Sequence, residues 1–238
     1  MRKLLERAMW VLAAIVALIH GTPAWATAAG SVILTINPPA LTVGLGEEFS
    51  VVIQAQAGSQ QVDGASAYIN FDPSVLQVVS VTAGSSLPIP IQNRFNNIAG
   101  TVDYSAGAFS NFPTGTFTLA TVKLTSIATS PGTALTFGSS LPRQSDVTFE
   151  GASVLGNTQG GTVIVVACTS CGDVNGDGAV GAVDALLIAQ HAIGLLPSLP
   201  CQAQSDVNGS GGVDIVDALF VWQRTAGLRA SLPCAPPP

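Results

Sequence analysis

A twelve-residue segment near the C-terminal end of the chain occurs twice in nearly the same form. DVNGDGAVGAVD runs from Asp173 to Asp184, and DVNGSGGVDIVD runs from Asp206 to Asp217. Both copies have oxygen-bearing side chains at positions 1, 3, 5 and 12 and glycine at position 6. Oxygens at this spacing wrap a calcium ion, and glycine permits a sharp turn in which a Cβ would clash. The two copies therefore predict two calcium-binding loops.

The repeat continues beyond the loops at a constant offset of 33 residues. DALLIAQHAIG from Asp184 matches DALFVWQRTAG from Asp217, and SLPC ends at both Cys201 and Cys234. Apolar residues recur in both segments at helical spacing, so each loop is expected to lead into an amphipathic helix. One such loop sequence is compatible with an ordinary Asx turn, but two in register, each followed by a helix, argue against it.

Two EF-hand-type loop–helix units with Asp rather than Glu at position 12 resemble the dockerin domain of cellulosome-type assemblies, over residues 172–234. The resemblance implies two calcium ions, the first held by Asp173, Asn175, Asp177, Ala179 and Asp184, and the second by Asp206, Asn208, Ser210, Gly212, Asp214 and Asp217. Ala179 and Gly212 would contribute only backbone carbonyls. Gly181 at position 9 implies a water ligand in the first loop, and Ser210 at position 5 lowers the negative charge of the second.

The same resemblance implies a partner-binding surface near loop positions 10 and 11 and on the helix that follows. These positions are Ala182 and Val183 in the first unit and Ile215 and Val216 in the second, with Trp222 further along the second helix. The family often has small hydroxyl residues at positions 10 and 11, so these apolar pairs depart from the pattern. Packing inside the calcium unit is the alternative for Val183 and Val216, and Trp222 is either a buried anchor between the repeats or an interface residue.

The first 26 residues have the organisation of a secretory signal peptide. Arg2, Lys3 and Arg7 precede an apolar run over residues 8–19, and Ala24-Trp25-Ala26 offers small residues for cleavage after Ala26. The apolar run is short for a membrane span, which needs about 20 residues. We therefore expect a secreted, extracellular protein with no membrane span after cleavage.

The acidity of the chain is concentrated in the repeat. The whole chain has a net charge of −6, and beyond residue 26 it holds five basic and thirteen acidic residues, six of the latter in the two loops. Basic residues do not cluster anywhere, so nucleic acid is not an expected partner.

The four cysteines, Cys168, Cys171, Cys201 and Cys234, all lie around the repeat. In an exported protein they predict two disulfides, which would support a module of about 65 residues with a small core. A zinc site that uses Cys168 and Cys171 is the alternative. Four cysteines allow three pairings, and their spacing does not choose among them. Because dockerin-like modules bring their two ends together, the resemblance favours a bridge from Cys168 or Cys171 to Cys234.

Residues 31–166 consist of short runs of Val, Ile, Thr and Phe separated by Gly, Pro, Asn and Ser. The runs are SVILTI, EFSVVIQAQA, ASAYINF, LQVVSVT, GTVDYSAGAF, GTFTLATVKLT, TALTF and GTVIVV. Eight or nine short strands without helical periodicity predict an antiparallel β-sandwich or jelly roll. The expected fold is therefore mainly β with a small α module: a sandwich over 31–166, a linker over 167–172, the dockerin-like module over 173–234 and a Pro-rich tail over 235–238.

Within this region, VGLGEEFSVV from Val43 and AYINFDPSVLQVVSVTAG from Ala67 resemble the cohesin domain, the sandwich that receives dockerins in the same assemblies. The segment Phe71 to Leu76 is expected to be a strand end, an Asp-Pro turn and a new strand. Related sandwiches, including carbohydrate-binding modules, contain the same sequence segment. Three interpretations of this half therefore remain open: a protein receptor, a sugar-binding module and an Ig-like sandwich without a partner. No short motif marks the receptor face of a cohesin, so no contact residues are assigned to this half.

Groups that could perform catalysis or bind sugar are sparse. His191 is the only histidine beyond residue 26 and is expected to be exposed on the first repeat helix, and the sandwich carboxylates are scattered over turns. We therefore expect no enzyme. The sandwich has no Trp, and Tyr68 is expected in its core, so no aromatic platform for sugar is indicated.

Together these features predict an exported, non-catalytic adaptor that joins dockerin- or cohesin-bearing extracellular proteins in a calcium-dependent way, in the setting of polysaccharide degradation. Other copies of the same chain and polysaccharide are further candidate partners. The alternative function is a carbohydrate-binding sandwich tethered through its dockerin-like module.

Overall fold

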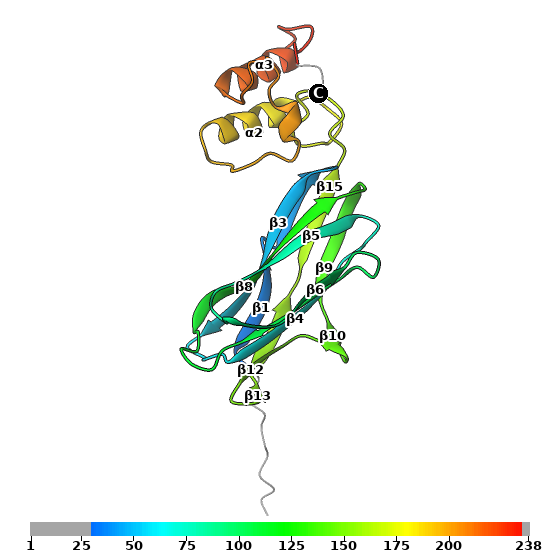
Figure 1. Cartoon of the computed structure of the whole chain (residues 1–238). Helices are drawn as coiled ribbons and strands as arrows, with labels where there is room; N and C mark the ends of the chain where they lie inside the picture. The colour runs from blue at the N-terminus through cyan, green and yellow to red at the C-terminus, as the bar shows by residue number, and fades with distance from the viewer. Residues whose placement is uncertain (1–29, 235–238) are drawn as a thin grey trace, which may run out of the picture.

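A β-sandwich with a small helical unit at one end makes up the computed structural model, which describes residues 30–234 (Figure 1). The expected signal peptide and the Pro-rich tail lie outside the described residues. The strands are β1 (Val32–Asn37), β2 (Ala40–Gly44), β3 (Glu48–Gly58), β4 (Gly64–Asn70), β5 (Leu76–Ala83), β6 (Ile89–Asn96), β7 (Thr101–Gly107), β8 (Gly115–Ser126), β9 (Ser130–Phe137), β10 (Ser139–Ser140), β11 (Arg143–Gln144), β12 (Asp146–Phe149), β13 (Ala152–Ser153), β14 (Leu155–Gln159) and β15 (Gly161–Val166). The helices are α2 (Ala182–Ala192), the 3₁₀ turn η1 (Gln202–Gln204) and α3 (Ile215–Thr225). The mainly β fold with a small helical module agrees with the prediction.

Two sheets face each other in the sandwich. One has the order β14-β1-β3-β8-β5, and the other has the order β13-β12-β4-β9-β15-β2, with β7 beside β4 and β6 beside β7. Most neighbours are antiparallel, as expected, but β1 pairs with β14 and β2 pairs with β15 in parallel. The first segment of the chain is shared between the sheets because Pro38 and Pro39, which separate β1 from β2, have no N–H for a continuous ladder.

The core of the sandwich comes from the inward positions of alternating strands. In β3, Val51, Ile53 and Ala55 are buried, while the residues between them face outward. Tyr104 on β7 is the largest fully buried side chain, and burial raises the pKa of its phenol. The expected Asp-Pro turn is present, and Asp72 accepts hydrogen bonds from the backbone N–H and the hydroxyl of Ser74, which lower its pKa.

The helical unit has a separate, smaller core and two disulfides. Its buried apolar residues are Val174, Ala185, Ile188, Leu199, Val207, Ala218 and Val221. Cys168 is bonded to Cys201, and Cys171 is bonded to Cys234, so the second bridge joins the two ends of the unit. All four cysteines are therefore disulfide-bonded, and the alternative of a zinc site at Cys168 and Cys171 is wrong. No helix within residues 30–234 has both the length and the apolar character that crossing a membrane requires.

The helical unit packs directly on the end of the sandwich. An ideal Cβ on Gly44, the last residue of β2, would lie 2.6 Å from the Cys168 Sγ and 2.6 Å from the Pro200 carbonyl oxygen. A Cβ on Gly176 would clash with the side chain of Val166, the last residue of β15. Glycine at both positions therefore lets the two parts approach closely.

Candidate calcium loops and partner-binding surfaces

The first loop is folded around Asp173. Its Oδ1 accepts a hydrogen bond from the Gly176 N–H (2.9 Å), and its Oδ2 accepts one from the Gly178 N–H (2.9 Å). Both glycines have positive φ angles, +72° and +90°, which L-residues with a side chain rarely adopt. The glycines therefore let the backbone turn twice around one carboxylate.

Asp184 closes the first loop from the helix side. Its Oδ1 accepts the N–H groups of Val174 (3.0 Å) and Asn175 (3.2 Å), and its Oδ2 accepts the N–H of Gly181 (2.8 Å). The same residue lies in the first turn of α2, where negative charge is favourable. Position 12 therefore ties the loop to the start of its helix.

Positions 3, 5 and 7 of the first loop follow one another in side-chain-to-backbone turns. The Asn175 Oδ1 accepts the Asp177 N–H (2.8 Å), and the Asp177 Oδ1 accepts the Ala179 N–H (2.9 Å). The Asn175 amide also donates to the Asp177 Oδ2 at 2.9 Å. These three candidate ligands therefore lie along one tight stretch of chain.

The second loop repeats much of this pattern. The Asp206 Oδ2 accepts the Gly211 N–H (2.8 Å), and the Asp217 Oδ1 accepts the Asn208 N–H (3.0 Å). Asp214, at position 9, donates its N–H to the Asp217 Oδ2 at 2.8 Å and also caps the N-terminus of α3. The repeated sequence thus produces repeated hydrogen bonding at positions 1, 6 and 12.

Positions 5 and 7 of the second loop differ from those of the first. The Ser210 Oγ donates to the Gly212 carbonyl at 3.2 Å, so a neutral hydroxyl lies where the first loop has the Asp177 carboxylate. The two oxygens that the dockerin resemblance assigns to these positions are therefore adjacent, but they carry no charge.

The donor chemistry of the loops fits a hard cation. Asp173, Asp184 and Asp217 are 0%, 1% and 0% exposed. The ion pairs found within residues 30–234 all lie in the sandwich, so these carboxylates have no cationic side chain beside them. Burying negative charge without a countercharge is costly, and oxygen donors suit calcium. Within the same residues, no three acidic, His or Cys side chains are gathered into a ready-made metal cluster. The loop carboxylates accept hydrogen bonds from backbone N–H groups.

An apolar groove runs between α2 and α3. It has a volume of about 400 Å³ and is lined by Ala185, Leu186, Ala189, Ile215, Ala218, Leu219 and Trp222. Leu186 and Leu219 occupy equivalent places in the two repeats and are 55% and 50% exposed. Every lining residue is apolar, so the groove suits a partner that can bury apolar surface.

The five partner-binding residues expected from the sequence lie on this side of the helices or next to it. Ile215 and Trp222 line the groove, whereas Ala182, Val183 and Val216 are exposed but outside its lining. Val183 is 57% and Val216 is 41% exposed, so neither packs inside the calcium unit. Trp222 is 55% exposed and is therefore not a buried anchor.

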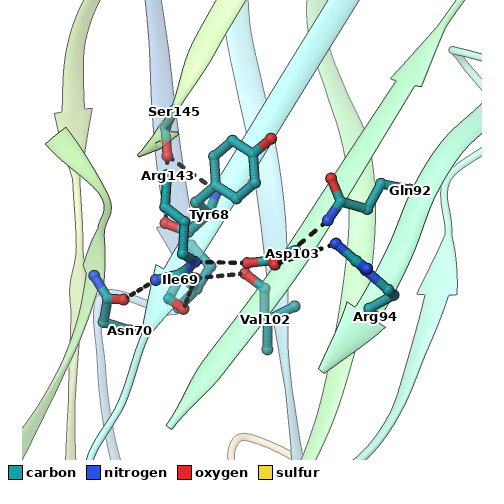
Figure 2. Close-up of polar contacts among 9 residues, drawn as sticks. All are labelled: Tyr68, Ile69, Asn70, Gln92, Arg94, Val102, Asp103, Arg143 and Ser145. Carbon is teal, nitrogen blue, oxygen red and sulfur yellow. Dashed lines mark hydrogen bonds and ion pairs between the residues drawn. The ribbon is translucent and has the colours of Figure 1, made fainter. Parts of the chain in front are cut away.

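A polar cluster lies on the outer face of the sandwich, across β4, β7, β6 and β11 (Figure 2). The Arg143 Nε lies 2.8 Å from the Asp103 Oδ1, and its Nη2 donates to the carbonyls of Ile69 (2.9 Å) and Val102 (3.2 Å). Arg94 approaches the other Asp103 oxygen at 4.0 Å. This cluster was not predicted, because its members come from four segments that only the fold brings together.

Tyr68 belongs to the same cluster, and its expected place in the core is wrong. It is only half-buried, points outward beside Asp103, its partner in the β4–β7 pairing, and lies under the Arg143 guanidinium, 5.7 Å from the ring centroid. His191 also differs from expectation, since it is partly buried. Its Nδ1 lies 2.9 Å from the Leu196 carbonyl oxygen, and its Nε2 lies 3.1 Å from the Gln202 amide.

Comparison with protein families divides the chain in the same two parts. The model of the cohesin domain matches residues 34–167, and that of the dockerin type I domain matches residues 171–225. A search of the curated proteins found no match.

Several solved structures are similar to a part of this chain. The third cohesin ScaC of Acetivibrio cellulolyticus, solved with the ScaB dockerin, is 19% identical over 57% of this chain and 99% of that chain, with a TM-score of 0.49. A type I cohesin–dockerin complex from Clostridium thermocellum, Coh-OlpC-Doc435, is 12% identical over 57% of this chain and 92% of that chain, with a TM-score of 0.48. A non-cellulosomal cohesin from the archaeon Archaeoglobus fulgidus is 16% identical over 57% of this chain and 91% of that chain, with a TM-score of 0.46.

Proposed function

Because the chain belongs to the cohesin family and carries a dockerin type I region after its cohesin domain, we propose that it is an exported, non-catalytic adaptor. Its sandwich would bind a dockerin-bearing protein, and its helical unit would bind a cohesin-bearing one. Calcium dependence and a setting in extracellular polysaccharide degradation are parts of the same proposal. The observation that carries it is the apolar groove between two helices that each follow a loop with buried carboxylates.

The ligands proposed for calcium are those of the repeated loops. The first loop would use Asp173, Asn175, Asp177, the Ala179 carbonyl and Asp184, and the second would use Asp206, Asn208, Ser210, the Gly212 carbonyl, Asp214 and Asp217. Bound calcium would supply the positive charge that the buried carboxylates lack. Asp184 and Asp217 also lie in the first turns of α2 and α3, so they link the shape of each loop to the position of its helix.

The polar cluster is the proposed receptor surface of the sandwich. It presents Arg94, with a side chain 74% exposed, next to Asp103 and the outward-facing Tyr68. Arginine and aromatic side chains are the groups most enriched in protein interfaces. The Tyr68 ring lies under Arg143 and is not free to stack on a sugar, so the cluster favours a protein partner over polysaccharide.

Binding by the helical unit is tested by calorimetric titration of the full chain with a panel of cohesins, in calcium and then in EDTA. We expect saturable binding that EDTA abolishes and that Leu219→Ala weakens. Leu228→Ala is the matched control, because Leu228 is 81% exposed but does not line the groove. The absence of heat with every cohesin, or equal effects of the two variants, would count against the groove as a partner site.

Binding by the sandwich is tested in the same way with a panel of dockerins. We expect Arg94→Ala to weaken binding, while Lys123→Ala leaves it unchanged. Both residues are exposed cations in ion pairs, but Lys123 pairs with Glu48 on the other sheet. Binding to cellulose or xylan in place of any dockerin would favour the alternative, a sugar-binding sandwich tethered through its helical unit.

A further inference from the structure

The two calcium loops have the same sequence pattern but different surroundings. The first loop packs on the sandwich, where Gly176, at position 4, lies against Val166. Asp173, at position 1, is fully buried, whereas the equivalent Asp206 is only partly buried. The first loop is therefore built into the junction between the two parts of the chain.

Further contacts hold the entrance of the first loop in place. Gly172, directly before the loop, donates its N–H to the Gln204 carbonyl at 2.9 Å, and the Val174 carbonyl accepts the Cys201 N–H at 3.1 Å. Cys201 is itself bonded to Cys168, the residue that lies against Gly44 of the sandwich. The sandwich, the linker and the first loop thus form one continuously packed segment.

The second loop is more open. Residues 209–212 are exposed, whereas the exposed stretch of the first loop is only residues 177–179. The Asp217 Oδ1 accepts one backbone N–H, whereas the Asp184 Oδ1 accepts two. With neutral Ser210 at position 5, this loop has fewer contacts to fix its shape and less charge at that position.

The groove depends more on the second unit than on the first. Three of its four large side chains, Ile215, Leu219 and Trp222, come from α3, and α2 contributes only Leu186. Asp217 belongs both to the second loop and to the first turn of α3, and Asp214 caps the same helix. Ordering the second loop therefore orders the helix that carries most of the groove.

From this asymmetry, and resting on the proposed calcium binding, we propose that the loops fill in order and have different roles. The first loop is held in shape by the sandwich, so it loses less conformational entropy on binding and fills at about tenfold lower calcium concentration. The filled first loop holds the helical unit in place against the end of the sandwich. The second loop fills later and is the switch that orders α3 and makes the groove competent for its partner.

The order is tested on the chain from residue 27 onward, in which Trp222 is the only tryptophan and reports on α3. Calorimetry follows total calcium binding while Trp222 emission is recorded over the same titration. We expect two phases, with the emission change in the second. Asp173→Ala and Asp206→Ala form a matched pair at position 1: the first should remove the tighter phase, and the second should remove the emission change and keep the tighter phase.

The role of the sandwich is tested with a substitution outside both loops. Gly44→Ala places a methyl group against the Cys168–Cys201 bridge and Pro200, so it should raise the calcium concentration that fills the tighter site about tenfold. Gly132→Ala in β9 is the control, because its Cβ would meet only Thr162 at an ordinary 3.5 Å. If Gly44→Ala lowers the thermal stability of the sandwich, Cys168→Ser with Cys201→Ser provides a second way to loosen the junction and should weaken the same site.

The outcomes separate this inference from the proposed function. An emission change in the first phase, equal effects of Asp173→Ala and Asp206→Ala, or an unchanged tighter site in both junction variants would overturn the order of filling and leave calcium binding intact. No calcium binding by calorimetry would instead overturn the calcium dependence on which the inference rests.

Discussion

Removing the Cys171–Cys234 disulfide should destabilise the helical unit and leave the sandwich nearly unchanged. The bridge closes a segment with a sequence separation of 63 residues, and the chain-entropy model gives about 4 kcal/mol for a loop of that length. The core of the unit contains seven buried apolar residues, so a loss of this size is a large share of its stability. In Cys171→Ser with Cys234→Ser, we expect the folded-to-unfolded ratio of the unit to fall about a thousandfold.

The assay is urea unfolding in excess calcium, with Trp222 emission reporting on the helical unit and far-ultraviolet circular dichroism near 217 nm reporting on the strands. The Trp222 midpoint should fall while the strand midpoint stays in place. Cys168→Ser with Cys201→Ser is the matched comparison, since its separation of 33 residues predicts a slightly smaller loss, also about 4 kcal/mol. A loss below about 1 kcal/mol in both variants, or a parallel fall of the strand midpoint, would refute the reasoning that the bridges act on a separate small core.

Three further substitutions test the sandwich by chemical denaturation. Thr35→Val should stabilise it by about 1 kcal/mol, because the buried Thr35 Oγ1 has no hydrogen-bond partner within the described chain; a loss of stability would indicate an unseen partner. Arg143→Ala should cost about 2–3 kcal/mol, because it removes the 2.8 Å contact with Asp103 and the hydrogen bond to the Ile69 carbonyl and leaves Asp103 only the longer contacts with Gln92 and Arg94. Arg143→Lys should recover little, since an ammonium cannot reproduce the fork of donors; full rescue by lysine would contradict this. Gly100→Ala should cost about 1–3 kcal/mol, because φ is +66° and the new Cβ would clash with the Phe71 carbonyl, whereas Gly132→Ala should be nearly neutral; equal melting temperatures would disprove the strain.

Strand positions were predictable wherever burial imposes alternation. All eight apolar runs identified in the sequence contain strands, and the inward set of β3 was readable from its pattern. β6 was missed because its sequence IPIQNRFN contains Pro90, and because Asn93 interrupts the alternation of Ile89, Ile91 and Phe95, none of which is buried. An edge strand that pairs only with β7 needs neither a full set of N–H donors nor a buried face.

The error on Tyr68 has a simple physical origin. Tyr68 shares the outward parity of Ser66 and Asn70, while Ala67 and Ile69 point inward, so the alternation already contained the correct answer. The buried face of each helix is harder to predict, because apolar residues occur around most of the helix circumference. Ile188 is buried and Leu186 is exposed, and the sequence of a helix that is apolar on two faces does not say which face packs on its neighbour.

The two proposed binding surfaces are chemically unlike each other, and this bears on whether the chain binds its own copies. The groove of the helical unit is entirely apolar, whereas the sandwich cluster is centred on Arg94, Asp103 and Arg143. Covering these charges with an apolar groove would remove their water and offer no polar partner in return, which is costly. The close packing of Gly44 on the Cys168–Cys201 bridge also restrains the helical unit from folding back onto that face. We therefore expect the protein to sediment as a monomer in calcium and to link two different partners. Calcium-dependent oligomers of the protein would show that its groove binds the polar cluster of a second copy.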